Sequence, residues 1–222
     1  IDSMGKKAIN LNRFSMIASL CLLSVFLCIT LLAANGEQHT EHCAERKSML
    51  LKMMDSMMTE MDSVSLDASV SGDFLRQMIP HHQGAVEMAE YEIKYGKSPE
   101  MIRLARKIVT AQQQEIAEME TMLKNYPYKE GETVPIKYVD AMTKIMMDMM
   151  HQTPTDMELK GKDVDCSFAM VMLPHHQAAV DMAMVFLKLE PQSQLVTFAQ
   201  SIVSDQKKEI EQMQKFIEND CK

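Results

Sequence analysis

Two stretches of the chain, MIPHHQGAVEMA at residues 78–89 and MLPHHQAAVDMA at residues 172–183, are nearly identical and start 94 residues apart. The same offset relates two later segments of the pattern QxxEIxxM, at residues 112–119 and 206–213. A repeat that keeps its spacing over two segments indicates a duplicated structural unit. Its pair of adjacent histidines reflects either a shared packing need or shared chemistry, and the rest of the sequence helps to decide between them.

Both segments of each repeat have the periodicity of helices. At about 100° per residue, the apolar residues and both histidines of the first segment fall within a stripe of about 120°. These residues are Phe74, Met78, His81, His82, Ala85, Met88 and Ala89. The breaks KYGKSPE (94–100) and LEPQS (189–193) predict turns, with Pro191 at or near the first position of the following helix. Pro80 and Pro174 indicate either a helix start or a kink beside the histidines.

The composition favours an all-α protein, because the 222 residues include 24 Met but just 7 Gly, no Trp and few aromatic residues. Two antiparallel helical hairpins, joined by the polar linker NYPYKEGETVP, predict one four-helix bundle with approximate internal twofold symmetry. Methionine-rich segments at 49–61 and 142–150 precede the hairpins and are expected to be further helices. We therefore predict one helical domain over 37–222, with internal repeats at about 49–124 and 136–219.

The first 36 residues have the pattern of a signal peptide, with residues 1–3 as extra sequence before Met4. Basic residues precede an apolar stretch at 17–34, and small residues suit cleavage before Glu37. An uncleaved membrane anchor is the alternative. Cleavage would leave an exported protein, periplasmic or extracellular, without a stable membrane span. Its 20 basic and 30 acidic residues, a net charge of −10, do not suit nucleic acid.

The repeated stripe predicts a metal site, because imidazole and thioether together favour a soft or borderline ion, with Cu(I) foremost and iron or zinc as alternatives. The candidate ligands are Met78, His81, His82, Met88, Met119, Met172, His175, His176, Met182 and Met213. Polar residues on the second helix of each hairpin, Gln112, Glu115, Gln206 and Glu209, are expected to orient the histidines by hydrogen bonds. As direct ligands, the glutamates would instead shift the preference toward iron, manganese or zinc, and at the solvent edge of the stripe they would only cap a polar network.

Methionine is more abundant than packing explains, because the chain after residue 36 has 22 Met and 11 Leu. Methionine fills cores and also forms adaptable surfaces for protein partners. Some of these thioethers are expected near the surface, where they could bind Cu(I) or Ag(I). Candidate accessory ligands are His39, His42, Cys43, Met53, Met57, Met146, Met150 and His151. Cys166 and Cys221 lie where the ends of an antiparallel hairpin meet, so a disulfide between them is plausible, although a pairing with Cys43 stays open.

The paired segments, each followed by QxxEIxxM, resemble an exported bacterial family known as domain of unknown function 305, described as ferritin-like. The resemblance covers roughly residues 49–217 and implies a four-helix bundle outside the cytoplasm. Some methionine-rich members are linked to copper binding and copper tolerance. The resemblance implies a copper-binding role for the residues that match the family motif. These are Met78, His81, His82 and Met88, and in the second repeat Met172, His175, His176 and Met182. The Glu-x-x-His pattern of di-iron proteins is absent from the motif helices, which argues against a di-iron oxidase.

The sequence therefore predicts an exported protein that sequesters or transfers Cu(I) or Ag(I), with a copper-transport or copper-accepting protein as its partner. No nucleophile elbow, phosphate-binding loop or HExxH motif is present, so the sequence favours a protein that is not an enzyme. A metal-dependent oxidase that uses glutamate and histidine is one alternative. A helical interaction module without metal, in which methionines line a groove for a partner, is the other.

Overall fold

The computed structural model describes residues 49–222, and this part of the chain folds into seven helices with no strand. A helix over residues 49–62 comes first. It is followed by α2 (Val70–Tyr95), α3 (Pro99–Leu123), α4 (Ile136–Gln152), α5 (Asp156–Leu159), α6 (Val164–Leu189) and α7 (Val196–Asp220). The predicted signal peptide, the anchor alternative and residues His39, His42 and Cys43 lie outside the described residues. Between residues 49 and 222, no helix is both long and apolar enough to span a bilayer.

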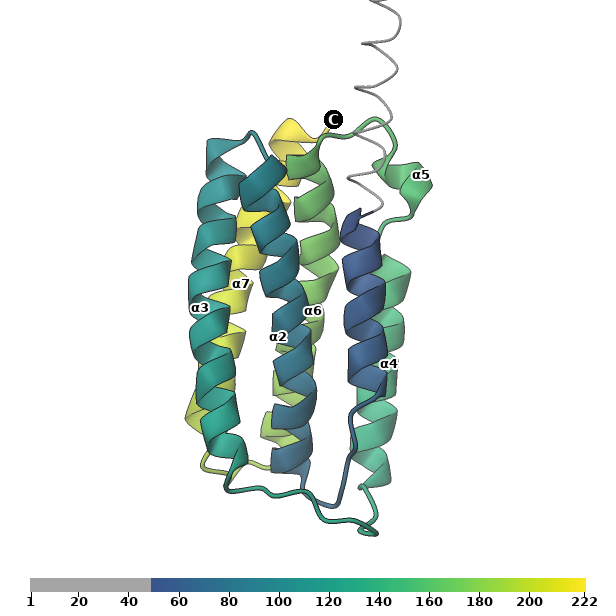
Figure 1. The fold of residues 1–222 in the computed structure, drawn as a ribbon, viewed down its shortest axis with the longest axis vertical. Coiled ribbons are helices and arrows are strands. Elements are labelled where there is room, and N and C mark those ends of the chain that lie inside the picture. The colour runs from purple at the N-terminus through teal and green to yellow at the C-terminus, as the bar shows by residue number, and fades with distance from the viewer. Residues whose placement is uncertain (1–48) are drawn as a thin grey trace, which may run out of the picture. The chain divides into compact units, whose positions relative to one another are not determined.

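The long helices form two hairpins that pack on each other. Helix α2 pairs with α3 and α6 pairs with α7, while α2 and α6 join the two hairpins and α4 packs on α6. Figure 1 shows the helix 49–62, in dark blue, beside α4 on the flank of this arrangement. The fold is all-α with two repeated halves, and the helix that carries the histidines is central in each half.

The helix ends follow from side-chain caps. Ser69, Ser98 and Asp163 accept hydrogen bonds from the first backbone N–H groups of α2, α3 and α6. These bonds satisfy donors that a helix start otherwise leaves unpaired.

The expectation that Pro191 lies at the start of the last helix is wrong, because α7 begins at Val196. Pro191 follows Glu190 in a turn closed by a hydrogen bond from Ser193 N to Glu190 O of 3.0 Å. Proline suits that second position of a turn, because its fixed φ matches the turn.

Pro80 and Pro174 lie inside α2 and α6, so neither residue starts a helix. Each proline removes one backbone N–H directly before a histidine pair. Both helices continue through the proline because a long apolar face is buried on either side of it.

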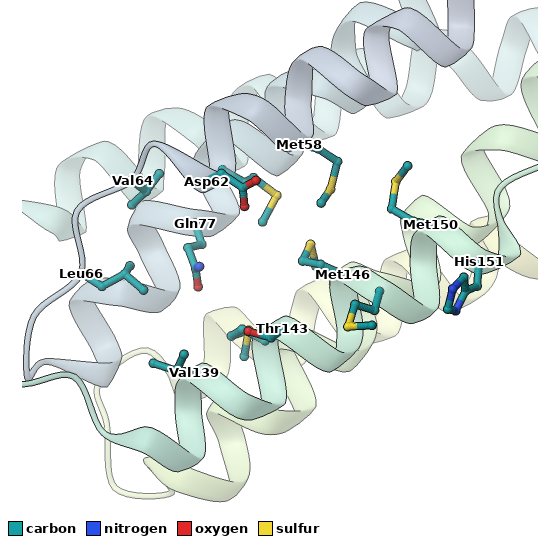
Figure 2. A pocket seen from close by; sticks show the side chains of 13 residues that line it. Met58, Asp62, Val64, Leu66, Gln77, Val139, Thr143, Met146, Met150 and His151 are labelled. Carbon is teal, nitrogen blue, oxygen red and sulfur yellow. The ribbon is translucent and has the colours of Figure 1, made fainter.

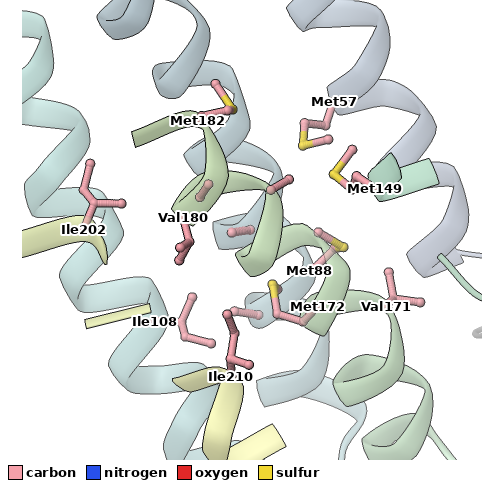
Figure 3. Packing of buried hydrophobic residues seen from close by; sticks show 14 of the residues in the cluster. Met57, Met88, Ile108, Met149, Val171, Met172, Val180, Met182, Ile202 and Ile210 are labelled. Carbon is pink, nitrogen blue, oxygen red and sulfur yellow. The ribbon is translucent and has the colours of Figure 1, made fainter. Parts of the chain in front are cut away.

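One hydrophobic core joins all the long helices and includes Met54, Met57 and Met61 of the first helix and Met142 and Met149 of α4. Figure 3 shows Met57 and Met149 beside the methionines and aliphatic residues of the repeats. Many of the methionines therefore serve as core residues, as flexible thioether side chains can.

A disulfide joins Cys166, in the first turn of α6, to Cys221 at the end of α7. It links the two ends of the second hairpin across 55 residues of chain.

Candidate metal site

Four imidazoles occupy the interior where α2 packs on α6, and each has an exposed fraction of 0%. His81 and His82 come from α2, and His175 and His176 come from α6. The rings of His81 and His175 lie with their centroids 3.9 Å apart and their planes at 38°. The repeat therefore brings its two histidine pairs together across the junction of the hairpins.

Burial lowers the pKa of His81 and of His175 well below the usual histidine range, and the neighbouring imidazoles lower it further. Both rings are therefore neutral at neutral pH. Neutral imidazole is the form that binds metal ions, because a protonated ring nitrogen has no lone pair to donate.

The outer histidine of each pair contacts a carboxylate. His82 Nε2 lies 3.0 Å from Glu115 Oε2, and His176 Nε2 lies 2.9 Å from Glu209 Oε2. A carboxylate can only accept, so each Nε2 donates the hydrogen bond, and in the neutral form of the ring each Nδ1 then keeps its lone pair. Both Nδ1 atoms are buried without a hydrogen-bond partner among the described residues. Histidines that bind metals are commonly held in this way by a carboxylate on the opposite nitrogen.

His175 is held by a different pair of acceptors. Its Nε2 lies 3.0 Å from the backbone oxygen of His81 and 3.2 Å from Met57 Sδ. The carbonyl accepts a hydrogen bond from Nε2–H, which leaves Nδ1 of the neutral ring with a free lone pair. His81 has no hydrogen-bond partner on either ring nitrogen among the described residues. A buried polar atom left unpaired costs about 1–3 kcal/mol, so the cluster is unfavourable unless a water or an ion binds there.

Met57 reaches the cluster because Gly84 of α2 lets the first helix approach closely. A Cβ at Gly84 would lie 2.8 Å from both Cβ and Cγ of Met57 and 3.0 Å from its Sδ. The second repeat has Ala178 at the equivalent position. The sequence placed Met57 only among the accessory ligands. The difference between Gly84 and Ala178 at equivalent positions of the repeats was the sequence signal that a neighbouring helix packs closely against α2.

The other candidate thioethers are core residues. Met78, Met88, Met119, Met172, Met182 and Met213 all have an exposed fraction of 0%. Within residues 49–222, the methionine whose thioether lies within hydrogen-bonding distance of an imidazole is Met57, which contacts His175. No group of three or more His, Cys, Asp or Glu side chains in that range is arranged to hold a metal ion.

The polar residues of the second helices are buried to different degrees. Glu209 is 4% exposed, and Lys107 Nζ lies 3.4 Å from its Oε1. Burial alone would raise the pKa of Glu209, but the interaction with His176, which includes a hydrogen bond, and the neighbouring Lys107 bring that pKa below its usual value. Gln112 and Gln206 are also buried, and neither side-chain amide has a hydrogen-bond partner among the described residues. These amides add four unpaired atoms to the interior of the two hairpins.

The accessory candidates separate into two groups. Met53 is half-buried against the core. Met146, Met150 and His151 are on α4 and line a surface groove with the helix 49–62. The structure thus divides the predicted ligands between a buried cluster and an open groove.

The family model described as "Domain of unknown function (DUF305)" matches residues 22–123 and again residues 127–217. The chain therefore belongs to the DUF305 family, and each match contains one copy of the repeat. A relative named "Uncharacterized protein L153", from Acanthamoeba polyphaga mimivirus, is 26% identical over 123 residues, which are 55% of this chain and 76% of the viral protein.

Solved structures of the protein CopM are similar to this chain at 28% identity. The Cu(I)-bound form covers 67% of this chain and 96% of CopM, with a TM-score of 0.50. The form soaked with Ag covers 68% and 97%, with a TM-score of 0.51. CopM has also been solved in a Cu(II)-bound form.

Proposed function

We propose that this member of the DUF305 family binds Cu(I), and Ag(I) in its place, as cargo in the buried histidine cluster. The observation that carries the proposal is the set of four buried imidazoles, three of which have one nitrogen held by an acceptor while Nδ1 is left unpaired. Such rings are already oriented as metal ligands, so no hydrogen bond has to break when an ion binds. The similarity to CopM supports the same conclusion.

The chemistry of the available donors favours Cu(I) over Fe(II) or Zn(II). Imidazole binds copper, zinc and iron, but the thioether is a soft, neutral donor that selects Cu(I) among them. Met57 Sδ beside His175 supplies a thioether at the cluster. The carboxylates of Glu115 and Glu209, hydrogen-bonded to the outer imidazoles, would balance the positive charge of a buried ion.

Further ligands would come from the thioethers on the same helices. The proposed set is Met78, His81, His82, Met88, Met119, Met172, His175, His176, Met182 and Met213, with Met57 added by the structure. In this proposal Glu115 and Glu209 orient histidines rather than bind the metal. We further propose that the two hairpins form a ferritin-like four-helix bundle. The protein would be exported after loss of residues 1–36, and it would sequester copper or transfer it to an accepting protein.

The proposal can be tested at His81, because neither of its ring nitrogens has a hydrogen-bond partner to lose. His81→Leu removes two unpaired buried nitrogens at similar volume. We expect the metal-free variant to be as stable as the wild type or up to about 1–3 kcal/mol more stable. Its Cu(I) affinity, measured anaerobically against a competing chelator, should fall about tenfold or more.

His175→Leu is the matched variant. It removes the donor to the backbone oxygen of His81, so both stability and Cu(I) affinity should fall. Parallel titrations with Fe(II) and Zn(II) compare the oxidase alternative with the copper proposal. Unchanged Cu(I) affinity in both variants would show that the histidine cluster is not the copper site, and tighter binding of Fe(II) would favour the oxidase.

A further inference from the structure

A second concentration of thioethers lies at the surface, away from the four imidazoles. The helix 49–62 and α4 leave between them a groove of about 440 Å³. Six of its thirteen lining residues are methionines, contributed by both helices. Figure 2 shows Met58 extending from one wall and Met146 and Met150 from the other, with their side chains directed into the space between the helices.

Met58 and Met146 pack in part against the core, but packing does not account for all the exposed thioether surface of the groove. Met147 and Met150 are 56% and 37% exposed, while Met58 and Met146 are only partly buried. Their thioethers therefore line open space, in contrast to the fully buried methionines of the repeats. A leucine would fill the same wall with a similar volume, so packing alone does not require sulfur at these positions.

The spacing along α4 places the sulfurs on one face. Met146 and Met150 are four residues apart, so they follow each other along the side of the helix that faces Met58. Thioethers from two helices therefore face the same groove. His151 lines the same groove and adds an imidazole, which is another ligand for soft and borderline ions.

The charge of the groove also suits a cation. Its lining includes the carboxylate of Asp62 and the amide of Gln77, and it includes no Lys or Arg. A positive ion that enters is therefore not opposed by a cationic side chain of the lining, and the single carboxylate attracts it. Hard ions gain little there, since most of the donors are sulfur.

We propose that this groove is a second site for a soft monovalent cation, Cu(I) or Ag(I), held by the thioethers of Met58, Met146 and Met150. The ligands are neutral, so binding releases no proton from them. The site is open to solvent, whereas the histidine cluster is closed. It stands on its own residues and does not depend on metal binding by the histidines.

The test uses Ag(I), which does not change oxidation state, and the disulfide-bonded protein labelled with ¹³C at the methionine methyl groups. Addition of Ag(I) should shift the methyl resonances of Met58, Met146 and Met150. The triple variant Met58→Leu, Met146→Leu, Met150→Leu keeps the apolar volume and should bind one Ag(I) equivalent fewer than the wild type. Its circular dichroism should match that of the wild type.

Matched controls are Met157→Leu and Met184→Leu, which change exposed methionines outside the groove, at 74% and 51% exposure. Both should keep the full Ag(I) stoichiometry. The single variant Met150→Leu tests the groove if the triple variant does not fold. It should lower the affinity of the groove for Ag(I) about tenfold.

The background His81→Leu separates the groove from the buried cluster. In the His81→Leu variant, the methyl resonances of Met58, Met146 and Met150 should still shift on addition of Ag(I), whether or not the histidine cluster binds an ion. Methyl resonances of the groove that do not move, or a triple variant with unchanged stoichiometry, would overturn the proposal. The latter result would leave the groove as an apolar surface of another kind, such as a contact for a protein partner.

Discussion

Replacing Glu209 by glutamine tests whether a carboxylate sets the protonation of a buried histidine. Glu209 Oε2 lies 2.9 Å from His176 Nε2, and both side chains are buried. The carboxylate can only accept a hydrogen bond, so it requires a proton on Nε2. Glutamine is nearly the same size but can also donate, so it permits the other tautomer. In that tautomer Nδ1 carries the proton and cannot bind a metal ion.

The expected magnitudes follow from this contact. A hydrogen bond to a charged group contributes about 1.5–3 kcal/mol and a neutral one about 0.5–1.5 kcal/mol, so Glu209→Gln should lower the free energy of unfolding by about 1 kcal/mol. The ion pair with Lys107 adds little, because that lysine is 53% exposed. Loss of a partner that orients a metal-binding histidine typically lowers metal affinity about 10- to 100-fold.

Three measurements on Glu209→Gln decide the outcome. Urea unfolding of the metal-free protein gives the stability change, and chelator competition gives the Cu(I) affinity. Long-range ¹H–¹⁵N spectra of the imidazole of His176 show which nitrogen is protonated. The control is Glu211→Gln, which removes the same charge from an exposed position of the same helix. Wild-type Cu(I) affinity with an unchanged tautomer would refute the assignment of Glu209 as the group that orients His176.

Three further changes test other contacts of the fold. Gly84→Ala places a Cβ 2.8 Å from Met57 Cβ and should destabilise the protein by about 1 kcal/mol in thermal unfolding, because overpacking exceeds the gain in helix propensity. Replacing Cys166 and Cys221 by serine opens a cross-link over 55 residues and should lower the free energy of unfolding in urea by about 4 kcal/mol. Burial and the neighbouring acid Asp165 raise the pKa of Glu92 to about 9, from a usual 4.5. Between pH 4.5 and about 9 the folded chain keeps a proton on Glu92 that the unfolded chain releases, so the free energy of unfolding should fall as pH rises. Glu92→Gln should remove this pH dependence and stabilise the protein at pH 8 by on the order of a few kcal/mol.

Each of these changes has a control. Ala178→Gly, at the equivalent position of the second repeat, should cost about 1 kcal/mol through helix propensity and leave Cu(I) affinity unchanged. Gly84→Ala should weaken Cu(I) binding as well, and a stabilised Gly84→Ala variant would contradict the close contact. A reductant should lower the melting temperature of the wild type but not of the serine variant. A wild-type stability that stays flat from pH 5 to 9 would contradict a protonated Glu92.

The helices and the presence of an unusual histidine pair follow from local sequence patterns. The apolar stripe that includes Met78 and His82 repeats every turn, and such periodicity depends only on helix geometry. The cysteine positions, at the start of one helix and the end of the next, likewise follow from the order of elements along an antiparallel hairpin. Pro191 shows where local signals are ambiguous, because proline is favoured both in the first turn of a helix and within a β-turn.

The sequence by itself determined an all-α fold with two repeated halves and an apolar stripe that includes both histidine pairs, but it left the role of Glu115 and Glu209 open. The structure showed that all four histidines are buried and that each outer histidine contacts a glutamate 33 residues later. Only the tertiary structure decided that the rings of His81 and His175 meet, and that Met57 contacts His175 across 118 residues of chain. The physical reason is that helical periodicity is a property of neighbouring residues. Which stripe faces which depends on how closely whole helices can pack, here on the missing Cβ of Gly84.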